Sequence, residues 1–476
     1  MVDYRKSITA RIDWITIVIY LLMVGLGWVS IYAATHQEDQ SFVLFDMSTR
    51  YSKQFVFLLA ALVLALIVII IDSEFWVLFT YPIYLGMVLI LILVLFVGEE
   101  INGARSWFVF GPLSMQPAEF AKIATVLALS KFLSRFNFEI HKTKNLLLLA
   151  LMIIAPTLLI LKQNDTGTAM VFLALVLVLF REGLNESLFI FGLFSVMFFF
   201  LTLVISISVL IPLVSLASLI FASWRIRRIS YFIFGSVLLA GIFMLIYYLS
   251  QRLGWELSAN RIVLSGSLFS APIVLYILYR TRRRQLQFIF AVWLGSVILI
   301  GSVDFLFNEV LEEHQRLRID QVLGMDNDPL GAGYNLNQSK IAIGSGGFMG
   351  KGFLQGTQTR FDFVPEQSTD FIFCTIGEEW GFVGSTLIVL LFAGFLIRLI
   401  FLAERQRSHF SRIFGYGVFS IFFFHFLVNI GMTIGIVPVI GIPLPFFSYG
   451  GSSLWSFTIL LFIFLHLDTD RFDVVA

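Results

Sequence analysis

Two positions in this sequence place residues capable of acid–base chemistry in an unusually apolar setting. Glu119 stands three residues before Lys122, and both share one helical face if Pro117 opens a helix at its first position. Asp370 stands where a long polar stretch meets an apolar run. A carboxylate close to apolar surface is a candidate general base with a raised pKa, and a charged pair at a membrane edge is costly enough to suggest function.

Each of these positions also has a purely structural explanation. Glu119 and Lys122 would form an ordinary ion pair at a helix end, and Asp370 would be a helix N-cap, a common role for aspartate. Asp165, in the segment KQNDTGT, reads as a turn residue with an Asx cap, which its chemistry favours. For the other three residues, the residue types alone leave the choice open.

The polar stretch from 328 to 379 is glycine-rich, and irregular backbone of this kind must lie outside a bilayer or line a cavity in it. Its run GSGGFMGKG resembles a phosphate-binding loop but departs from that motif, because Ser345 replaces the first glycine and Gly352 follows Lys351. Its amides would bind an anion, or the run is a flexible lid. Glu378 and Glu379 then indicate either a buried network with Arg or Lys or a general base.

A second irregular segment is expected at 429–453. It contains three prolines and five glycines, which exclude one regular helix. We expect a broken, re-entrant segment at the outer surface, where non-helical backbone lines a cavity.

The composition predicts a polytopic membrane protein. The 476 residues are 58% hydrophobic and 13% charged, with a mean hydropathy of +0.91, which is too apolar for a soluble protein. A net charge of +1 gives no electrostatic basis for binding nucleic acid. The single cysteine, Cys374, excludes an intramolecular disulfide and a cysteine metal site. The N-terminus lacks a signal-peptide pattern, so the first apolar run reads as a retained anchor.

Fourteen apolar runs are candidate membrane spans. Pro212 and the length of the region 187–224 divide that region into two of them. The runs are 12–34, 54–71, 75–97, 118–133, 146–161, 168–180, 187–205, 207–224, 229–249, 264–279, 286–307, 371–403, 413–437 and 450–467.

Basic residues in the short loops predict the orientation. Alternate loops carry clusters of arginine and lysine, which the positive-inside rule assigns to the cytoplasm together with both termini. The long polar loop and the motifs beside it then face outward. The clusters contain Arg5, Lys6, Arg11, Arg135, Lys142, Lys144, Arg225, Arg227, Arg228, Arg280, Arg282, Arg283, Arg284, Arg405, Arg407 and Arg412.

Several short motifs follow one another on the side predicted to face outward. Together they resemble the SEDS family of peptidoglycan polymerases (shape, elongation, division and sporulation), and the DPLGAGY and QSKIAIGSGG runs favour its elongation branch over its division branch. The motifs are Gly103-Ala104-Arg105-Ser106-Trp107, Gln116-Pro117-Ala118-Glu119-Phe120-Ala121-Lys122, Asp165-Thr166-Gly167-Thr168, DPLGAGYNLNQSKIAIGSGGFMGKG, Pro365-Glu366, Thr369-Asp370-Phe371, Pro443-Leu444-Pro445 and Ser448-Tyr449-Gly450-Gly451-Ser452-Ser453.

The resemblance implies an all-α polytopic membrane protein with a large extracytoplasmic loop. It covers about 1–186 and 308–476, where the family has ten spans, and breaks in between, where about four helices are added. One motif reads Gln163-Asn164-Asp165 where the family has Gln-Pro-Asp, which changes a turn residue and keeps the acid. We expect four parts: N-terminal helices with outer-face motifs (1–186), inserted helices (187–307), the extracytoplasmic loop with the catalytic motif (308–370) and C-terminal helices (371–476).

The resemblance also implies an activity. Members of the family join the disaccharide units of lipid II at the outer face of the bacterial cytoplasmic membrane and release undecaprenyl pyrophosphate. The family's essential acid falls on Asp370, expected as general base on the acceptor 4-hydroxyl, and two further catalytic positions fall on Glu119 and Lys122. The leaving pyrophosphate needs cations, and the residues expected to bind substrate are Arg105, Asp165, Arg318, Gln338, Ser339, Lys340, Lys351 and Ser448.

The implied partner is a class B penicillin-binding protein, which crosslinks the new glycan. The cofactor considered is a divalent metal ion, Mg²⁺ or Mn²⁺, held by Glu119 or Asp370, since hard cations prefer carboxylate oxygen.

Two other functions compete with polymerisation. A lipid II flippase suits the large number of helices, but its transport path would need polar sites near the midplane of the membrane, and the charges cluster toward one face. A non-catalytic scaffold of the wall-synthesis machinery would tolerate substitution of Asp370 or Glu119.

Overall fold

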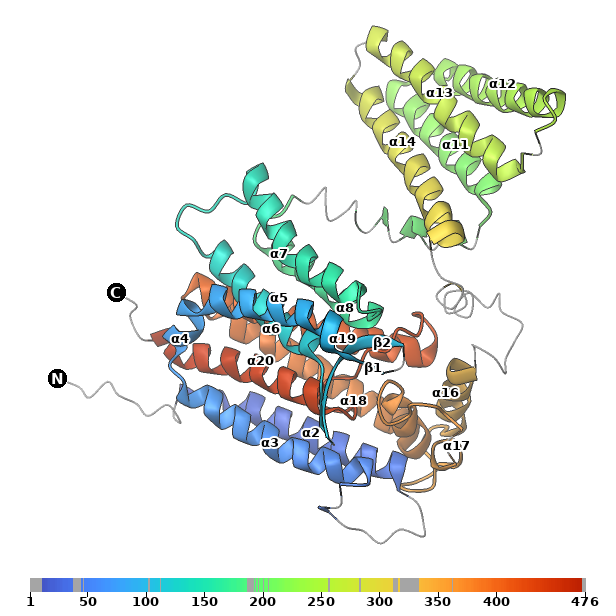
Figure 1. Ribbon diagram of the computed structural model, residues 1–476. Helices are drawn as coiled ribbons and strands as arrows, with labels where there is room; N and C mark the ends of the chain where they lie inside the picture. Colours follow the sequence, from blue (N-terminus) through green and yellow to red (C-terminus); the bar gives the residue numbers. More distant parts are fainter. Residues whose placement is uncertain are drawn as a thin grey trace. The chain divides into compact units, whose positions relative to one another are not determined.

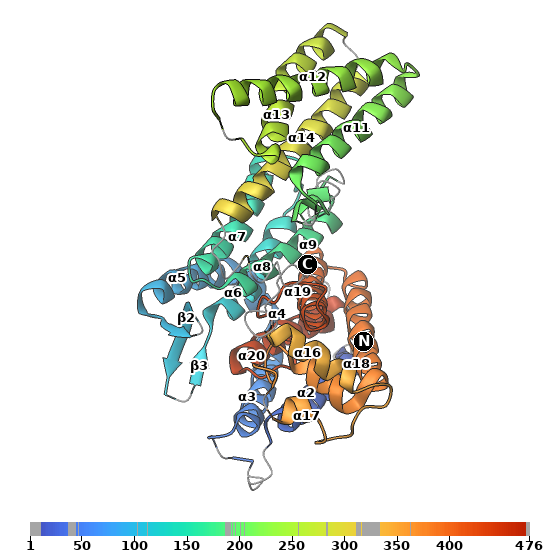
Figure 2. The ribbon, with the colours of Figure 1, turned by 90° about the vertical axis from the view of Figure 1, so that its right-hand side faces the viewer.

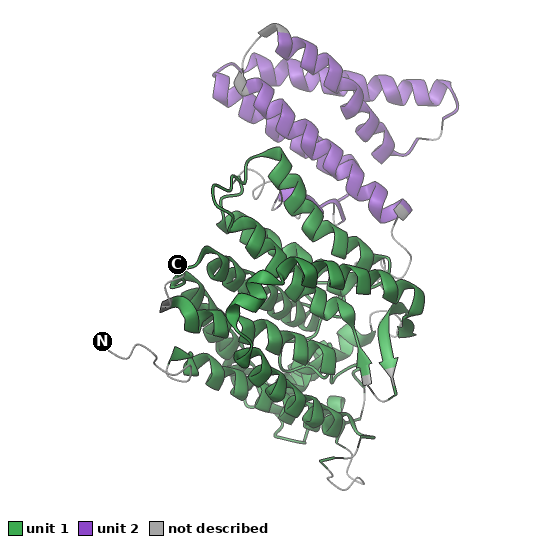
Figure 3. Ribbon diagram, turned by 60° about the vertical axis from the view of Figure 1, so that its left-hand side comes forward, with its two compact units in different colours: residues 1–185, 324–476 green, residues 186–323 purple. Residues whose placement is uncertain are grey.

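The computed structural model describes residues 11–36, 44–45, 47–101, 103–111, 113–185, 192, 194–195, 197–199, 201–203, 205–255, 257–281, 284–310, 316, 334–361 and 363–472. The chain divides into two compact units, which Figure 3 colours separately. One comprises residues 1–185 and 324–476, and the other comprises residues 186–323.

The first unit begins with a series of apolar helices (Figure 1). Pro117 occupies the first turn of α6, as the sequence predicts, because its fixed φ suits that position and its missing N–H is not needed there. The helices are α2 (Trp14–Thr35), α3 (Arg50–Ile70), α4 (Ser73–Leu78), α5 (Thr80–Val97), α6 (Pro117–Leu133), α7 (Thr143–Leu161), α8 (Thr166–Val171), the 3-10 turn η1 (Phe172–Leu175) and α9 (Val176–Arg181).

The C-terminal part of the chain completes this unit. Helix α20 lies at its centre, where it packs against α3, α6 and α19. The elements are α16 (Tyr334–Ser345), α17 (Thr357–Arg360), α18 (Ile372–Glu404), α19 (His409–Ile434), α20 (Gly451–Thr469) and the 3-10 turn η3 (Asp470–Phe472).

Between α19 and α20 the chain is not helical over residues 436–450, which confirms the predicted break. Gly435 ends α19 in the left-handed region, at φ 79°. Its second half, 442–448, is largely enclosed: Leu444 and Phe447 are buried, and Gly27 of α2 lies directly against the backbone of Phe446. Irregular backbone therefore passes through the interior of the helical unit.

A small antiparallel sheet was not predicted from the sequence and corrects the purely helical expectation. It contains β1 (Glu99–Ile101), β2 (Ala104–Phe110) and β3 (Leu113–Met115) in the order β1-β2-β3. Figure 2 shows β2 and β3 side by side. Aromatic and β-branched residues in the run Trp107–Phe110, followed by a turn at Gly111, favour strands, whereas the expectation from the sequence was a loop between the runs 75–97 and 118–133.

Helix α18 changes direction at Gly381, where φ is 62° and ψ is −159°. The glycine-rich run packs onto this point, because Phe382 donates its N–H to the carbonyl of Gly347 at 2.9 Å and Val383 donates to that of Phe348 at 3.2 Å. A side chain at Gly381 would meet the backbone of Gly350. The loop and the first turns of α18 thus form one packed structure.

A small hydrophobic core lies within this packed structure. It contains Ala342, Val364, Phe371 and Cys374, and the single cysteine is completely buried. Phe371 is also the N-cap of α18, although its side chain cannot accept a hydrogen bond there.

An ion-pair cluster lies at the other end of α18. The Nε of Arg398 donates to Asp13 at 3.2 Å, and that of Arg405 donates to Asp468 at 2.8 Å. Burial raises the pKa of Asp13, but hydrogen bonds from Arg398 and Thr16 outweigh it and hold that pKa below its ordinary value. The cluster ties the start of α2 to the ends of α18 and α20.

The described part of the second unit contains four long helices with a core of their own, which includes Ile211, Val297 and Ile300. The indole Nε1 of Trp293 donates to the hydroxyl of Ser215 at 2.9 Å. The helices are α11 (Ile207–Ile226), α12 (Ser230–Arg252), α13 (Ala259–Thr281) and α14 (Arg284–Phe305), followed by the π-helical turn η2 (Leu306–Val310).

Among the described residues, eleven helices are long and apolar enough to cross a membrane. Three of the fourteen predicted runs are not among these eleven helices. Helix α6 is short and carries Glu119 and Lys122, and residues 166–181 form only a shorter apolar helix. Nine of the nineteen residues in the run 187–205 lie outside the described residues. The chain is therefore an all-α polytopic membrane protein apart from its small sheet, with about eleven spans.

We predict that Gly381→Ala lowers the thermal unfolding midpoint of the detergent-purified protein. The backbone conformation at this position costs a residue with a side chain about 1–3 kcal/mol, before the clash with Gly350 is counted. The matched control is Gly394→Ala in the same helix, where an added Cβ meets nothing within 4 Å. Equal midpoints for the two variants would contradict this account of the bend.

Candidate functional site

Glu119 and Lys122 form a buried ion pair in α6. Their oxygen and nitrogen lie 2.9 Å apart, and both side chains are almost inaccessible, at 3% and 2% exposure. The Nζ of Lys122 also lies 3.0 Å from Nε2 of His425 in α19 and 4.9 Å from the centre of the Phe457 ring in α20. Residues from three helices therefore surround the ammonium group of Lys122. An ordinary ion pair at a helix end, which was the structural explanation, would not include the contacts with α19 and α20.

Hydrogen-bonded polar side chains lie near the N-terminus of α6, before this ion pair. Gln116 donates through its side-chain amide to Asp165, and its backbone N–H donates to Ser452 at 3.0 Å. Asp165 accepts the N–H of Thr168 at 3.0 Å as the N-cap of α8, which confirms the Asx cap. Burial raises the pKa of Asp165, and the charge of Glu119 adds to the increase.

Asp370 lies directly before α18 and is half-buried. Its backbone carbonyl accepts a hydrogen bond from Asn429 at 2.9 Å. Its carboxylate lies next to Gly441, since a Cβ on that glycine would be 3.4 Å from Oδ2. The N-cap explanation for Asp370 is wrong, because Phe371 occupies that position and no side chain caps the helix.

Ser448 holds the irregular segment against the Asp370 region. Its hydroxyl donates to the carbonyl of Thr369 at 2.6 Å and accepts the N–H of Leu444 at 2.8 Å. Tyr449 donates its N–H to the carbonyl of Ser368 at 2.8 Å. Because the hydroxyl of Ser448 both donates and accepts a hydrogen bond with the backbone, its observed role is to position that backbone.

The irregular segment joins the two carboxylate regions. Nδ1 of His425 lies 3.1 Å from the carbonyl oxygen of Pro443, and Asn429 donates to the carbonyl of Ile442 at 2.7 Å. The same Asn429 amide contacts Asp370 on the other side. One turn of α19 thus links the backbone beside Asp370 to the ion pair in α6.

Glu378 organises the glycine-rich loop. It is completely buried, and it accepts backbone N–H groups of Thr357, Gln358 and Thr359 at 2.8–2.9 Å. The Nζ of Lys351 lies 2.6 Å from the same carboxylate. This confirms the predicted buried network for Glu378 and shows that the Lys351 ammonium is used within the loop.

The other predicted binding residues lie in different surroundings. Ser339 is buried and donates to the carbonyl of Thr433 at 3.0 Å, while the neighbouring Gln338 is half-buried. Lys340 is exposed, with its ammonium over Gly435. Arg105 is exposed on β2, and Arg318 lies outside the described residues.

The described residues contain no group of three His, Cys, Asp or Glu side chains placed to hold a metal ion. Glu119 directs Oε2 to the ammonium of Lys122. A metal ion on these carboxylates would therefore depend on ligands from elsewhere.

The fold and the site define a multi-pass membrane protein in which polar groups gather where irregular backbone passes between helices. A family model described as a cell cycle protein family, FtsW/RodA/SpoVE, matches residues 13–236 and 263–472, and the chain belongs to this family.

Individual relatives agree with this assignment. The chain is 32% identical to the peptidoglycan glycosyltransferase RodA of Treponema pallidum (strain Nichols) over 447 residues, which is 93% of this chain and 94% of the relative. It is 30% identical to the peptidoglycan glycosyltransferase MrdB of Escherichia coli (strain K12), over 78% of this chain and 72% of the relative. A solved chain from a peptidoglycan synthase complex that coordinates polymerization and crosslinking aligns with a TM-score of 0.63 at 28% identity, covering 97% of this chain and 99% of the other.

The family match corrects one boundary. The sequence analysis placed a break in the resemblance over 187–307, whereas the family model leaves only 237–262 unmatched between its two parts. The region is rich in aliphatic residues and lacks polar motifs, so its residue types alone do not show the match. The assignment of 187–307 as inserted helices stays a prediction.

Sequence reasoning missed three residues that contact the predicted ones. His425 and Asn429 stand four residues apart on one face of α19, a spacing that could have drawn attention to them. Gln116 belongs to a quoted motif but received no role. Polar side chains on one face of an otherwise apolar span are a signal that would have identified His425 and Asn429, although not Gln116.

We predict that Lys122→Met strongly destabilises the protein, by about 3–5 kcal/mol, because it leaves the buried Glu119 carboxylate without its partner. The double variant Glu119→Gln/Lys122→Met removes both charges and should recover most of that loss. The measurement is the thermal unfolding midpoint of each variant in detergent. Additive losses in the double variant would show that the two groups do not stabilise each other.

Proposed function

We propose that this chain, a peptidoglycan glycosyltransferase by its family, polymerises lipid II into glycan strands at the outer face of the bacterial cytoplasmic membrane. The observation that carries the proposal is the position of Asp370, a half-buried carboxylate at the start of a membrane span, next to the irregular segment. A general base for a sugar hydroxyl needs such a carboxylate close to apolar surface.

In the proposed reaction Asp370 accepts the proton of the acceptor 4-hydroxyl. The hydroxyl oxygen attacks the anomeric carbon of the donor sugar, the bond from that carbon to the pyrophosphate oxygen breaks, and undecaprenyl pyrophosphate leaves. The backbone around Asp370 is held by Asn429 and Ser448, which supports a fixed position for its carboxylate.

The leaving pyrophosphate requires positive charge in this proposal. Arg105 and Lys340 are supported as ligands because both side chains are exposed. Arg318 is retained from the resemblance to the family alone. Lys122 and Lys351 already neutralise Glu119 and Glu378, so we assign them to positioning the surrounding backbone.

The remaining residues predicted to bind substrate differ in their burial. Asp165 and Ser339 are buried and bonded within the protein, which favours a role in holding the site together. Gln338, half-buried beside Lys340, is the better candidate for contacting a substrate.

We infer that the protein acts during cell elongation and with a class B penicillin-binding protein. The relative from Treponema pallidum is named RodA, and the similar solved chain comes from a complex that couples polymerization to crosslinking. The role in elongation and the class B partner are both inferred from the motifs and from these relatives.

The central experiment is polymerisation of purified lipid II by the full-length protein with its class B partner. We predict that Asp370→Asn abolishes glycan product while the protein keeps its wild-type unfolding midpoint, because the amide cannot accept the proton. The control is Glu366→Gln, four residues earlier in the same loop, where the carboxylate is exposed. Full activity of Asp370→Asn would remove Asp370 from the mechanism.

Other outcomes of this assay identify the competing functions. Translocation of lipid II in vesicles without any polymer would establish a flippase. Normal wall synthesis in cells that carry Asp370→Asn or Glu119→Gln would establish a scaffold.

A divalent cation bound by Asp370 together with the substrate pyrophosphate is also proposed. We predict that chelation with EDTA then lowers the polymerisation rate and that Mg²⁺ or Mn²⁺ restores it, since both ions prefer carboxylate and phosphate oxygen. An unchanged rate after chelation would contradict the metal ion and leave the role of Asp370 as base intact.

A further inference from the structure

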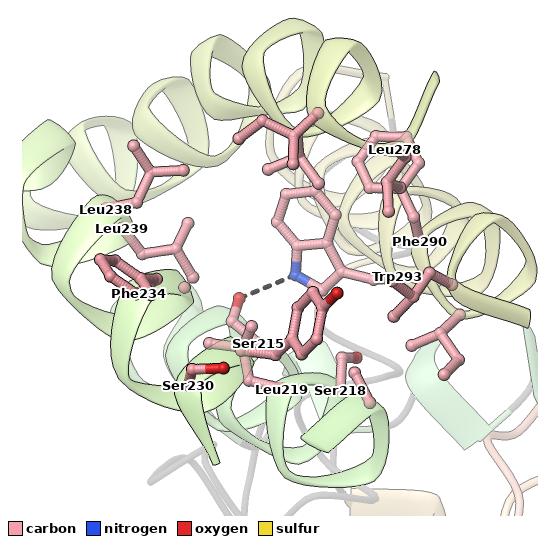
Figure 4. A pocket seen from close by; sticks show the side chains of 17 residues that line it. Ser215, Ser218, Leu219, Ser230, Phe234, Leu238, Leu239, Leu278, Phe290 and Trp293 are labelled. Atoms are coloured by element: carbon pink, nitrogen blue, oxygen red, sulfur yellow. Dashed lines mark hydrogen bonds between the residues drawn. The ribbon is translucent and has the colours of Figure 1, made fainter. Parts of the chain in front are cut away.

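The four-helix unit contains a cavity of about 470 Å³ that the reaction above does not use. Figure 4 shows its side chains arranged around an open space, with the Trp293 indole bonded to Ser215. Its lining is almost wholly apolar, and the hydroxyl of Ser218 is occupied by the carbonyl of Val214 in its own helix. The volume falls in the range of about 300–1,000 Å³ typical of ligand sites, and the wall offers few polar contacts.

The cavity lies toward one end of the four helices. Its lining comes from the last turns of α11 and α13 and from the first turns of α12 and α14. The residues from these helices fall in 215–222, 230–239, 274–278 and 286–293. The cavity is therefore close to the two turns that connect these helices at this end.

Those two connecting turns are strongly basic. At the first, Arg225 lies in the last turn of α11 and Arg227 and Arg228 follow that helix, all with exposed side chains. At the second, the sequence reads RTRRR over 280–284. The positive-inside rule predicts that this end faces the cytoplasm. Exposed arginines at a membrane surface attract anionic headgroups.

The cavity is bordered by side chains that face the outside of the unit. Phe234 and Ile277 line it and are 75% and 46% exposed. In a membrane the surroundings of these side chains are lipid chains, so hydrocarbon is the occupant with direct access.

We propose that this cavity binds one acyl chain of an anionic phospholipid of the cytoplasmic leaflet, with the phosphate headgroup on Arg225 and Arg228. The apolar wall selects a hydrocarbon chain, and the arginines at the adjacent end select negative charge. The site does not depend on the activity assigned to Asp370.

The test uses the full-length protein in nanodiscs of phosphatidylcholine that contain increasing amounts of phosphatidylglycerol with brominated acyl chains. Bromine quenches tryptophan fluorescence at short range, and the signal of Trp293 is the difference between wild type and Trp293→Phe. We expect half-maximal quenching of Trp293 at about a tenfold lower mole fraction of brominated phosphatidylglycerol than of brominated phosphatidylcholine, given two arginines at the headgroup.

Matched variants separate the chain from the headgroup. Ser218→Phe places a ring in the cavity and should abolish quenching of Trp293, whereas Ala217→Phe, at the neighbouring exposed position, should leave it unchanged. Arg225→Gln/Arg228→Gln should remove the preference for phosphatidylglycerol, and Arg225→Lys/Arg228→Lys should keep it. Native mass spectrometry of wild type and Ser218→Phe, counting retained phosphatidylglycerol, gives a second readout if Trp293→Phe does not fold.

Two results would overturn the proposal. One is equal quenching by the two brominated lipids in the wild type. The other is displacement of brominated phosphatidylglycerol by undecaprenyl phosphate but not by unlabelled phosphatidylglycerol, which would assign the cavity to a polyisoprenyl chain.

Discussion

The segment 436–450 imposes the main constraint on this structure, because irregular backbone inside an apolar helical unit must find a partner for its polar groups. Side chains from neighbouring helices supply several of these partners. Asn429 and His425 contact the carbonyls of Ile442 and Pro443, and Gln54 accepts the N–H of Gly450 at 3.1 Å. The burial of Gln54, His425 and Asn429 is thus explained by the backbone groups with which they bond.

The same constraint explains why charged residues in this protein have two different roles. Glu378 is surrounded by backbone N–H groups and a lysine, so its charge fixes the shape of the glycine-rich loop. Asp370 has its backbone fixed by others while its carboxylate lies at the edge of the irregular segment. Glu378, whose oxygens accept several backbone N–H groups, is therefore poorly suited to accept a proton.

Residue types were sufficient to predict eleven of the membrane helices, the start of α6 at Pro117 and the break before α20, because each depends on local sequence. The ion pair of Glu119 and Lys122 also followed from their spacing. The contact with His425 did not, since it joins residues about three hundred positions apart and depends on packing. The N-cap assigned to Asp370 failed for a similar reason: the chain turns one residue later, and tertiary contacts of the segment before α18 decide where that helix begins.

The complete burial of Cys374 has a practical consequence for experiments on the orientation of the chain. A thiol with no exposed surface is shielded from water-soluble maleimides, so the native protein should give little background labelling. Single cysteines introduced at exposed positions such as Arg105 or Arg228 would then report directly which side of the membrane each connection occupies. The sidedness inferred from the arginine clusters can in this way be mapped without first removing the native thiol.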